Sequence, residues 1–178
     1  MIEKGKISQE PFIEILKTLE EAESANLVDW NAMNIASVDQ MNQPSSRMVL
    51  LKKISDDGLV FYTNYNSRKG KEIELNPKVA VNFWWRELKK QIRVEGFIEK
   101  ASEEDSDDYF YSRPLKSRVS AIISNQSSKI SSYEDLTNQI DNYLEQNDES
   151  SIKRPDHCGL YLSLIHIYAA DDRGCVDL

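Results

Sequence analysis

The chain has 178 residues, of which 40% are hydrophobic and 29% are charged, and its formal net charge is −8 at pH 7. This balance is typical of a globular protein with a buried core, and the acidic charge disfavours general binding to nucleic acid or to anionic membranes. No apolar stretch approaches the length of about 18 residues that a membrane-spanning helix needs. The first residues are polar and contain no signal-peptide core, so we expect a cytoplasmic protein.

The positions of cysteine and histidine exclude two common classes of site from most of the chain. Cys158, Cys175, His157 and His166 are the residues of these types, and none precedes His157. A Cys/His zinc site, a disulfide framework and a Ser-His-Asp triad are therefore excluded before that point. We expect no metal site, and chemistry carried by lysine, arginine, tyrosine, carboxylates or a bound cofactor.

Hydrophobic spacing predicts a sheet of hairpins followed by helices. Helices are expected over residues 9–25, 67–75, 103–111, 114–123 and 133–146. Ser8 and Ser67 are the expected N-caps of the first two. Strands are expected over 32–39, 47–54, 59–63, 79–85 and 91–100. Because most strands form hairpins, the expected fold is mainly β with helices (α+β), its antiparallel sheet closed or nearly closed into a barrel. Residues 147–153 are expected to be a polar linker.

A cluster of basic residues stands out in this acidic chain. Its members are Arg47, Lys52, Lys53, Arg68, Lys69 and Lys71. Arg47 and Lys52 bracket an apolar strand, where a charge is costly unless it has a partner. Lys53 and Lys71 are as well explained by solubility. The cluster favours a small anionic ligand over a polynucleotide.

The start of the helix at 67–75 is the strongest anion site in this cluster. Arg68 and Lys69 open the helix directly behind the expected cap Ser67. The first free N–H groups, the helix dipole and two cations together favour a phosphate. Arginine suits bidentate phosphate binding, and lysine supplies a point charge.

Three further segments each have a structural and a functional interpretation. The aromatic residues at 61–62 and 83–85 are expected in the core or a dimer interface, although a flat heterocycle could also lie against them. The segment 109–117 is either a corner between two helices or, through Tyr109, Arg113 and Ser117, a second phosphate site. The polar run 124–128 is typical of a segment that caps the next helix.

Taken together, several segments resemble the pyridoxamine (pyridoxine) 5'-phosphate oxidase family. The resemblance runs from about Pro11 to about His157 and rests on S-R-M-V-L-L-K (46–52), G-L-V-F-Y-T-N (58–64), S-R-K (67–69), N-P-K-V-A (76–80), Q-I-R-V-E-G (91–96), Y-F-Y-S-R-P (109–114) and S-N-Q-S-S-K-I (124–130). It implies a split β-barrel homodimer with FMN at the subunit interface. It further implies oxidation of phosphorylated B6 vitamers to pyridoxal 5'-phosphate with O₂ as acceptor, and no nucleic-acid or membrane partner.

The resemblance also implies site residues. FMN contacts fall on Arg47, Met48, Val49, Leu50, Leu51, Lys52, Tyr62, Thr63, Arg68, Lys69, Gln91, Gln126 and Ser127. Substrate-phosphate contacts fall on Lys52, Tyr109, Arg113 and Ser117. No catalytic residue is assigned. Arg47 and Lys52 would point to opposite faces of a regular strand, so a bulge or a site between subunits is needed to reconcile them.

From Cys158 onward the sequence departs from the family pattern. Cys158 stands where the family has tryptophan, and the family's C-terminal arginine and histidine have no counterpart. We therefore expect one FMN-binding domain over 1–157, an atypical and poorly packed tail over 158–178, and impaired oxidase activity. Alternation over 160–167 leaves a strand there as the other possibility. A non-catalytic protein that binds FMN or a B6 phosphate, and another flavin reductase on the same barrel, are the alternative functions.

Overall fold

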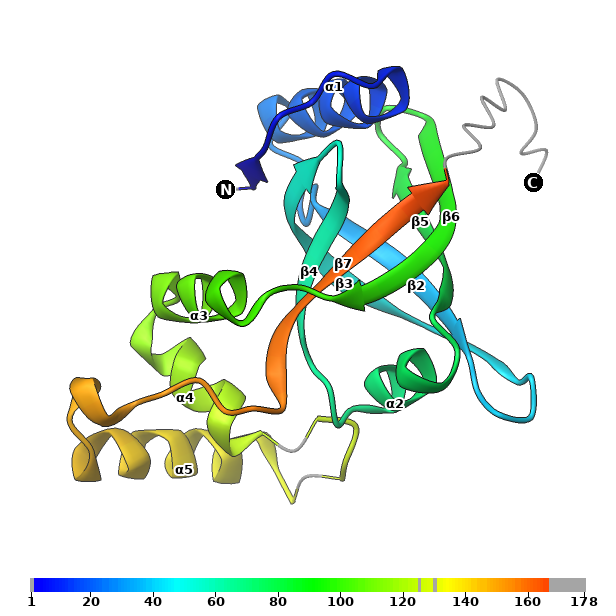
Figure 1. The fold of residues 1–178 in the computed structure, drawn as a ribbon. Helices are drawn as coiled ribbons and strands as arrows, with labels where there is room; N and C mark the ends of the chain where they lie inside the picture. The colour runs from blue at the N-terminus through cyan, green and yellow to red at the C-terminus, as the bar shows by residue number, and fades with distance from the viewer. Residues whose placement is uncertain (1, 125, 130, 167–178) are drawn as a thin grey trace. The chain divides into compact units, whose positions relative to one another are not determined.

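The computed structural model describes residues 2–124, 126–129 and 131–166 (Figure 1). Its elements are β1 (Glu3–Lys4), α1 (Glu10–Ser24), β2 (Ala32–Val38), β3 (Pro44–Ser55), β4 (Gly58–Asn64), α2 (Arg68–Leu75), β5 (Lys78–Trp85), β6 (Lys90–Lys100), α3 (Glu103–Ser112), α4 (Leu115–Ile123), α5 (Tyr133–Gln146), a 3₁₀ turn (Glu149–Ser151) and β7 (Cys158–His166). The described residues form two compact units. Among the described residues, unit 1 consists of 2–62, 72–99 and 161–166, and unit 2 consists of 63–71, 100–124, 126–129 and 131–160.

A closed antiparallel barrel makes up most of unit 1. The strands follow the order β3-β2-β5-β6-β7-β4, and β4 pairs back with β3 to complete the ring. The pairings β2–β3, β2–β5, β3–β4 and β5–β6 are antiparallel, while the short β1 adds to β3 in parallel. The expected α+β fold with an antiparallel barrel is confirmed.

The core of unit 1 follows the alternation that predicted the strands. Along β2, residues that face the core alternate with half-buried ones. The largest fully buried side chains of this unit include Ile15, Leu19, Met33, Ile35, Leu51, Ile54, Leu59, Phe61 and Phe83. Phe83 and Trp85 stack with their ring centroids 5.2 Å apart, whereas the Trp84 side chain is 52% exposed. Phe83 and Trp85 of the aromatic segment 83–85 are therefore part of the core, and Trp84 is not.

The start of α1 differs from the expectation. Gln9, not Ser8, occupies the N-cap position, and its side chain makes no capping hydrogen bond. The Ser8 hydroxyl instead donates to Asp56 at 2.5 Å, and the Ser8 and Gln9 backbone N–H groups also donate to that carboxylate. The carboxylate of Asp56, at the β3–β4 turn, therefore accepts the hydrogen bonds at the start of α1, where the sequence predicted that Ser8 would be the N-cap.

The strand β7 corrects the expectation of a poorly packed tail. Cys158, Leu160, Tyr161 and Ser163 are buried, and β7 occupies the position in the barrel between β6 and β4. Within unit 1, the rings of Tyr161 and Phe61 lie 5.8 Å apart. The alternative expectation of a strand is therefore confirmed as far as His166, and residues 167–178 lie outside the described part.

Unit 2 contains α3, α4 and α5, with the first two joined at a tight corner. Ser102 and Ser132 cap α3 and α5 by accepting from the N–H groups of Asp105 and Asp135 at 3.0 Å. The Tyr65 hydroxyl donates to the carbonyl of Leu160 at 3.0 Å, and burial raises the pKa of Tyr65 above its ordinary value. Among the described residues, no helix is both long and apolar enough to cross a membrane.

Asp56 predicts a specific dependence of stability on pH. The hydrogen bonds from Ser8, the side-chain bond foremost, lower the pKa of Asp56 below its ordinary value of 3.8. The bonded carboxylate therefore stabilises the fold above pH 3.8, and this contribution is lost as the pH falls through the lowered folded-state pKa.

Asp56→Asn should lower the thermal unfolding midpoint at pH 7 relative to the unsubstituted protein, and the difference should shrink steadily below pH 3.8. Glu14→Gln removes an exposed carboxylate of α1 and serves as the control, with little change at either pH. Calorimetry across pH 2.5–7 measures both variants. An Asp56→Asn difference that is the same at every pH would contradict the assignment.

Candidate functional site

The start of α2 in unit 2 is an ordered polar site. Ser67 is fully buried, and its hydroxyl oxygen accepts from the N–H of Gly70 at 3.3 Å, as an N-cap does. The hydroxyl of Ser67 donates in turn to the carbonyl of Asn64 at 2.6 Å. A Cβ atom on Gly70 would lie 2.0 Å from the carbonyl oxygen of Tyr65. The predicted cap is therefore confirmed, and this turn packs so closely that it needs glycine.

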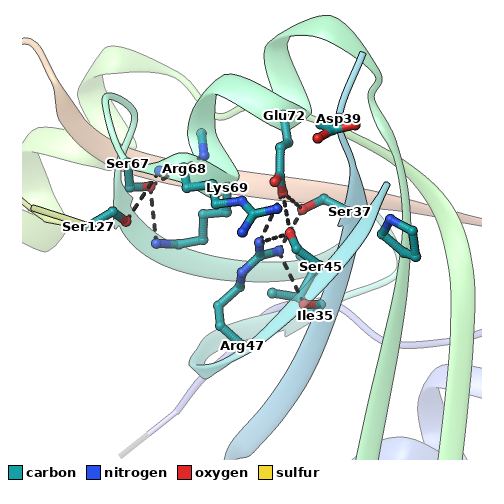
Figure 2. Close-up of polar contacts among 12 residues, drawn as sticks. Ile35, Ser37, Asp39, Ser45, Arg47, Ser67, Arg68, Lys69, Glu72 and Ser127 are labelled. Atoms are coloured by element: carbon teal, nitrogen blue, oxygen red, sulfur yellow. Dashed lines mark hydrogen bonds and ion pairs between the residues drawn. The ribbon is translucent and has the colours of Figure 1, made fainter. Parts of the chain in front are cut away.

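The polar run after α4 reaches this helix start. Lys69 is only 6% exposed, and its Nζ donates to Gln126 Oε1 at 2.8 Å and to Ser67 Oγ at 3.2 Å. The N–H of Arg68 donates to Ser127 Oγ at 3.2 Å, in a contact that Figure 2 shows. These two acceptors hold the ammonium group in one orientation at the helix start.

Five expected flavin contacts thus come together in unit 2. Thr63 completes the set, since its hydroxyl lies 3.4 Å from Gln126 Oε1. The residues are Thr63, Arg68, Lys69, Gln126 and Ser127. From the pattern alone, the run at 124–128 read as a helix cap, and the resemblance placed Gln126 and Ser127 in the site. An exposed arginine and a buried lysine at a helix N-terminus make a site suited to a phosphate.

In unit 1, the side chain of Arg47 is the centre of a second polar cluster. Nη1 of Arg47 donates to Ser37 Oγ at 2.5 Å and lies 3.4 Å from the carbonyl oxygen of Ile35. Nη2 donates to Ser45 Oγ and, at 2.9 Å, to Glu72 Oε2. Figure 2 shows these contacts between β2, β3 and α2. The partner that a charge on this strand requires is therefore Glu72.

Glu72 is the residue of this cluster that sequence reasoning missed. Its side chain is 4% exposed, and Oε2 also accepts from the hydroxyls of Ser37 and Ser45 at 2.5 and 2.6 Å. A carboxylate buried to this degree needs a cation and donors around it, and the cluster supplies both. Helical spacing does not predict the Arg47–Glu72 ion pair, because the partners of Glu72 lie on β2 and β3, which are distant from α2 in the sequence.

The remaining flavin contacts expected on β3 lie on both faces of the strand. Met48 and Leu50 are 61% and 41% exposed, whereas Leu51 is fully buried. The pairing of β3 with β4 runs from Leu51 opposite Phe61 to Lys53 opposite Val60, so the register shifts at Lys52. The strand therefore has an irregularity at Lys52, and a bulge is one of the two explanations that the sequence left open for Arg47 and Lys52. Val49 is half-buried.

Gln91 and Tyr62 are the last expected flavin contacts in unit 1. Gln91 is exposed on β6, and its Nε2 donates to Asn82 Oδ1 at 2.8 Å. Along β6 the buried residues are Val94 and Ile98, so Gln91 lies on the opposite face. Tyr62 is half-buried in β4.

The three substrate-phosphate residues of unit 2 lie at the corner between α3 and α4. Arg113 is the C-cap of α3 and its N–H donates to the carbonyl of Phe110, while the N–H of Ser117 donates to the carbonyl of Pro114 at 2.8 Å. Tyr109, Arg113 and Ser117 are each half-buried. The predicted helix corner is confirmed, and its role as a phosphate site stays a prediction. Lys52, the fourth residue of that set, belongs to unit 1.

Comparison with known proteins gives clear sequence relatives. Residues 19–143 match the family described as "Pyridoxamine 5'-phosphate oxidase". The pyridoxine/pyridoxamine 5'-phosphate oxidase of Nostoc sp. (strain PCC 7120) is 47% identical over 154 residues, which are 86% of this chain and 72% of the relative. Pyridoxine/pyridoxamine 5'-phosphate oxidase 2 of Hydrogenovibrio crunogenus is 40% identical over 161 residues, which are 90% of this chain and 76% of the relative.

Solved structures share the fold. PhzG from Burkholderia lata superimposes with a TM-score of 0.81 at 24% identity, covering 89% of this chain and 78% of that one. A pyridoxamine 5'-phosphate oxidase-related, FMN-binding protein from Nostoc punctiforme gives a TM-score of 0.68 at 18% identity, covering 88% and 82%. With the fold in agreement and the sequence match extending over most of its length, the chain belongs to the pyridoxamine 5'-phosphate oxidase family.

Proposed function

We propose that this protein is an FMN-dependent oxidase that converts pyridoxamine or pyridoxine 5'-phosphate to pyridoxal 5'-phosphate with O₂ as electron acceptor. The observation that carries the proposal is the polar site at the start of α2, where Lys69 and Gln126 meet at 2.8 Å. The activity named for relatives at 40–47% identity supports the same reaction.

The residues present fit FMN. A single helix start with Arg68 and Lys69 suits one terminal phosphate, because the helix dipole and both cations favour an anion there. The chain has only six glycines and no glycine-rich dinucleotide loop, which favours FMN over FAD. Ser67 and Gln126 hold the ammonium group of Lys69 in one orientation at this helix start.

In this mechanism the protein binds and orients, and the cofactor supplies the redox chemistry. When bound, FMN would supply the redox chemistry, which is acceptance of a hydride from the substrate carbon and reoxidation by O₂ with release of peroxide. Arg68 and Lys69 would neutralise the cofactor's phosphate, while Glu72 and two serine hydroxyls hold the guanidinium of Arg47 in one orientation. Arg113, with Tyr109 and Ser117, would hold the substrate's phosphate. By holding both phosphates, these residues would orient cofactor and substrate relative to each other and so lower the entropic cost of the reaction.

Arg68→Ala should weaken FMN binding by about 1.5–3 kcal/mol, because it removes a charge-assisted hydrogen bond to the phosphate. A flavin-fluorescence titration of the apoprotein measures the change. Lys71→Ala is the matched control, since Lys71 is an exposed cation of the same helix and should matter little. If both substitutions weaken FMN binding equally, positive charge alone attracts the cofactor, and the assignment of Arg68 as a specific phosphate ligand is wrong.

The proposed reaction is tested by adding pyridoxamine 5'-phosphate to the FMN-loaded protein and measuring peroxide release. Turnover is expected, and Arg113→Ala should raise the KM for the substrate at least tenfold while leaving FMN content intact, since it removes a charged phosphate ligand. Loss of flavin in that variant would mean that the two phosphate sites are assigned the wrong way round. Tight FMN binding without turnover would favour the non-catalytic alternative.

We also propose that the protein is a homodimer. The outer face of the barrel exposes Met48 and Leu50 on β3 and Trp84 on β5, at 61%, 41% and 52%. Apolar side chains gathered on strands separated only by β2 favour burial against a second copy. Light scattering at micromolar concentration should give the mass of a dimer, and a monomeric mass with FMN bound would contradict this. The cytoplasmic location stays a prediction.

A further inference from the structure

We propose that Glu72 is a positioning residue for FMN binding, acting through the guanidinium of Arg47. The inference rests on the proposed function, since it takes Arg47 as a contact of the cofactor. Glu72 belongs to neither set of expected site residues, and the role inferred here does not require it to touch FMN. Its side chain is 4% exposed, and charged side chains are rarely buried to that degree unless they are paired.

The partners of Glu72 lie on one face of the β2–β3 pair. The register places Ser37 directly opposite Ser45, and it places Ile35 opposite Arg47. Residues paired in this way point to the same face of an antiparallel pair. Because Ile35 and Ser37 are buried, this face is the inner one. The side chain of Arg47 therefore starts from the inner face of β3, where Glu72 of α2 meets it.

The chemistry of these side chains allows one direction for every hydrogen bond. Arginine only donates and an ionised carboxylate only accepts, whereas a hydroxyl does both. Nη1 of Arg47 donates to Ser37 Oγ at 2.5 Å, and that hydroxyl donates to Glu72 Oε2 at 2.5 Å. Nη2 donates to Ser45 Oγ, whose hydroxyl donates to the same Oε2 at 2.6 Å. With the direct bond of 2.9 Å from Nη2, one carboxylate oxygen orients both ends of the guanidinium.

These contacts determine which part of Arg47 is left for a ligand. Nη1 has a further contact of 3.4 Å with the carbonyl oxygen of Ile35, so both terminal nitrogens already have two acceptors in the protein. Among the described residues, Nε has no hydrogen-bond partner, and the side chain is 22% exposed. Arg47 would therefore meet FMN through the N–H group that the cluster does not use.

Charge alone would give Glu72 the opposite effect on FMN affinity. A carboxylate beside Arg47 offsets part of the positive charge that attracts an anionic cofactor, so its removal would strengthen binding if only charge mattered. Orientation acts in the other direction, because a side chain that must be ordered on binding lowers affinity. The direction of the change in affinity therefore separates the two roles.

Two substitutions of Glu72 separate geometry from charge. Glu72→Gln keeps the length of the side chain and an acceptor oxygen for the two hydroxyls, but it loses the charge. Glu72→Asp keeps the charge but is shorter by one methylene, so its oxygens should no longer reach all three donors. Glu74→Gln is the matched control, since Glu74 is an exposed carboxylate of the same helix. Flavin-fluorescence titration of the apoprotein gives the FMN dissociation constant of each variant.

Glu72→Asp should bind FMN about tenfold more weakly than the unsubstituted protein, because Arg47 is no longer held in one orientation. Glu72→Gln and Glu74→Gln should each stay within about threefold. Undiminished affinity in Glu72→Asp would overturn the inference. An equal loss in Glu72→Gln would also overturn it, since the effect would then follow the charge and not the geometry.

The same substitution in a second background tests whether Glu72 acts through Arg47. Arg47→Met alone should weaken FMN binding, and adding Glu72→Asp should then cause little further loss, because the group that it positions is gone. A full tenfold loss in the Arg47→Met background is the result of a purely structural role and would overturn the inference. Should Glu72→Asp fail to fold, Ser37→Ala and Ser45→Ala each remove one hydroxyl of the cluster, and their effects should depend on Arg47 in the same way.

The unsubstituted protein and Arg47→Met distinguish this inference from the proposed function. If the unsubstituted protein does not bind FMN, both are wrong. If it binds FMN and releases peroxide with pyridoxamine 5'-phosphate, but Arg47→Met keeps full FMN affinity, then Arg47 is not a cofactor contact. In that case the role of Glu72 is wrong and the oxidase assignment stands.

Discussion

Closure of the barrel is the constraint on which the fold depends. The strand order leads from β3 through β2, β5, β6, β7 and β4 back to β3, so each of these strands has a hydrogen-bonded neighbour on both sides. Gly58 shows how tightly this is achieved, since a Cβ atom there would lie 1.8 Å from the carbonyl oxygen of Ser163. Its φ of 143° also lies outside the range that other residues readily adopt. The hairpin between β3 and β4 therefore needs glycine for two separate reasons.

Two buried charged side chains, Glu72 and Lys69, are each held by several hydrogen bonds. Glu72 ties β2, β3 and α2 together through one guanidinium and two hydroxyls, and removing Arg47 would take away the cation that lies 2.9 Å from this buried carboxylate. Lys69 is similarly buried, and its ammonium group donates to the oxygens of Ser67 and Gln126. Both buried charged groups are therefore held in one orientation by hydrogen bonds.

Much of the fold could be read from local patterns. Alternation located the strands, and Ser67 followed by Arg68 and Lys69 located the helix start. What failed was long-range: Asp56 displaces Ser8 from its expected role, and Glu72 meets Arg47 across 25 positions. The alternation over 160–167 predicts a strand, whereas the departure from the family pattern after His157 favours a poorly packed tail. The strand forms because a place in the barrel requires only apolar side chains and backbone hydrogen bonds. The contacts of Gln126 and Ser127 needed the family resemblance as well.

The place of β7 in the chain has a consequence for biosynthesis. The strand that separates β6 from β4 is made after α3, α4 and α5, so a nascent chain carries both of these strand edges unpaired while the intervening segment of about 60 residues is translated, which takes on the order of several seconds. Open edges of apolar strands invite pairing with other chains. Ribosome-bound intermediates of this protein are accordingly the stage at which a chaperone that covers exposed strands would have the most to protect.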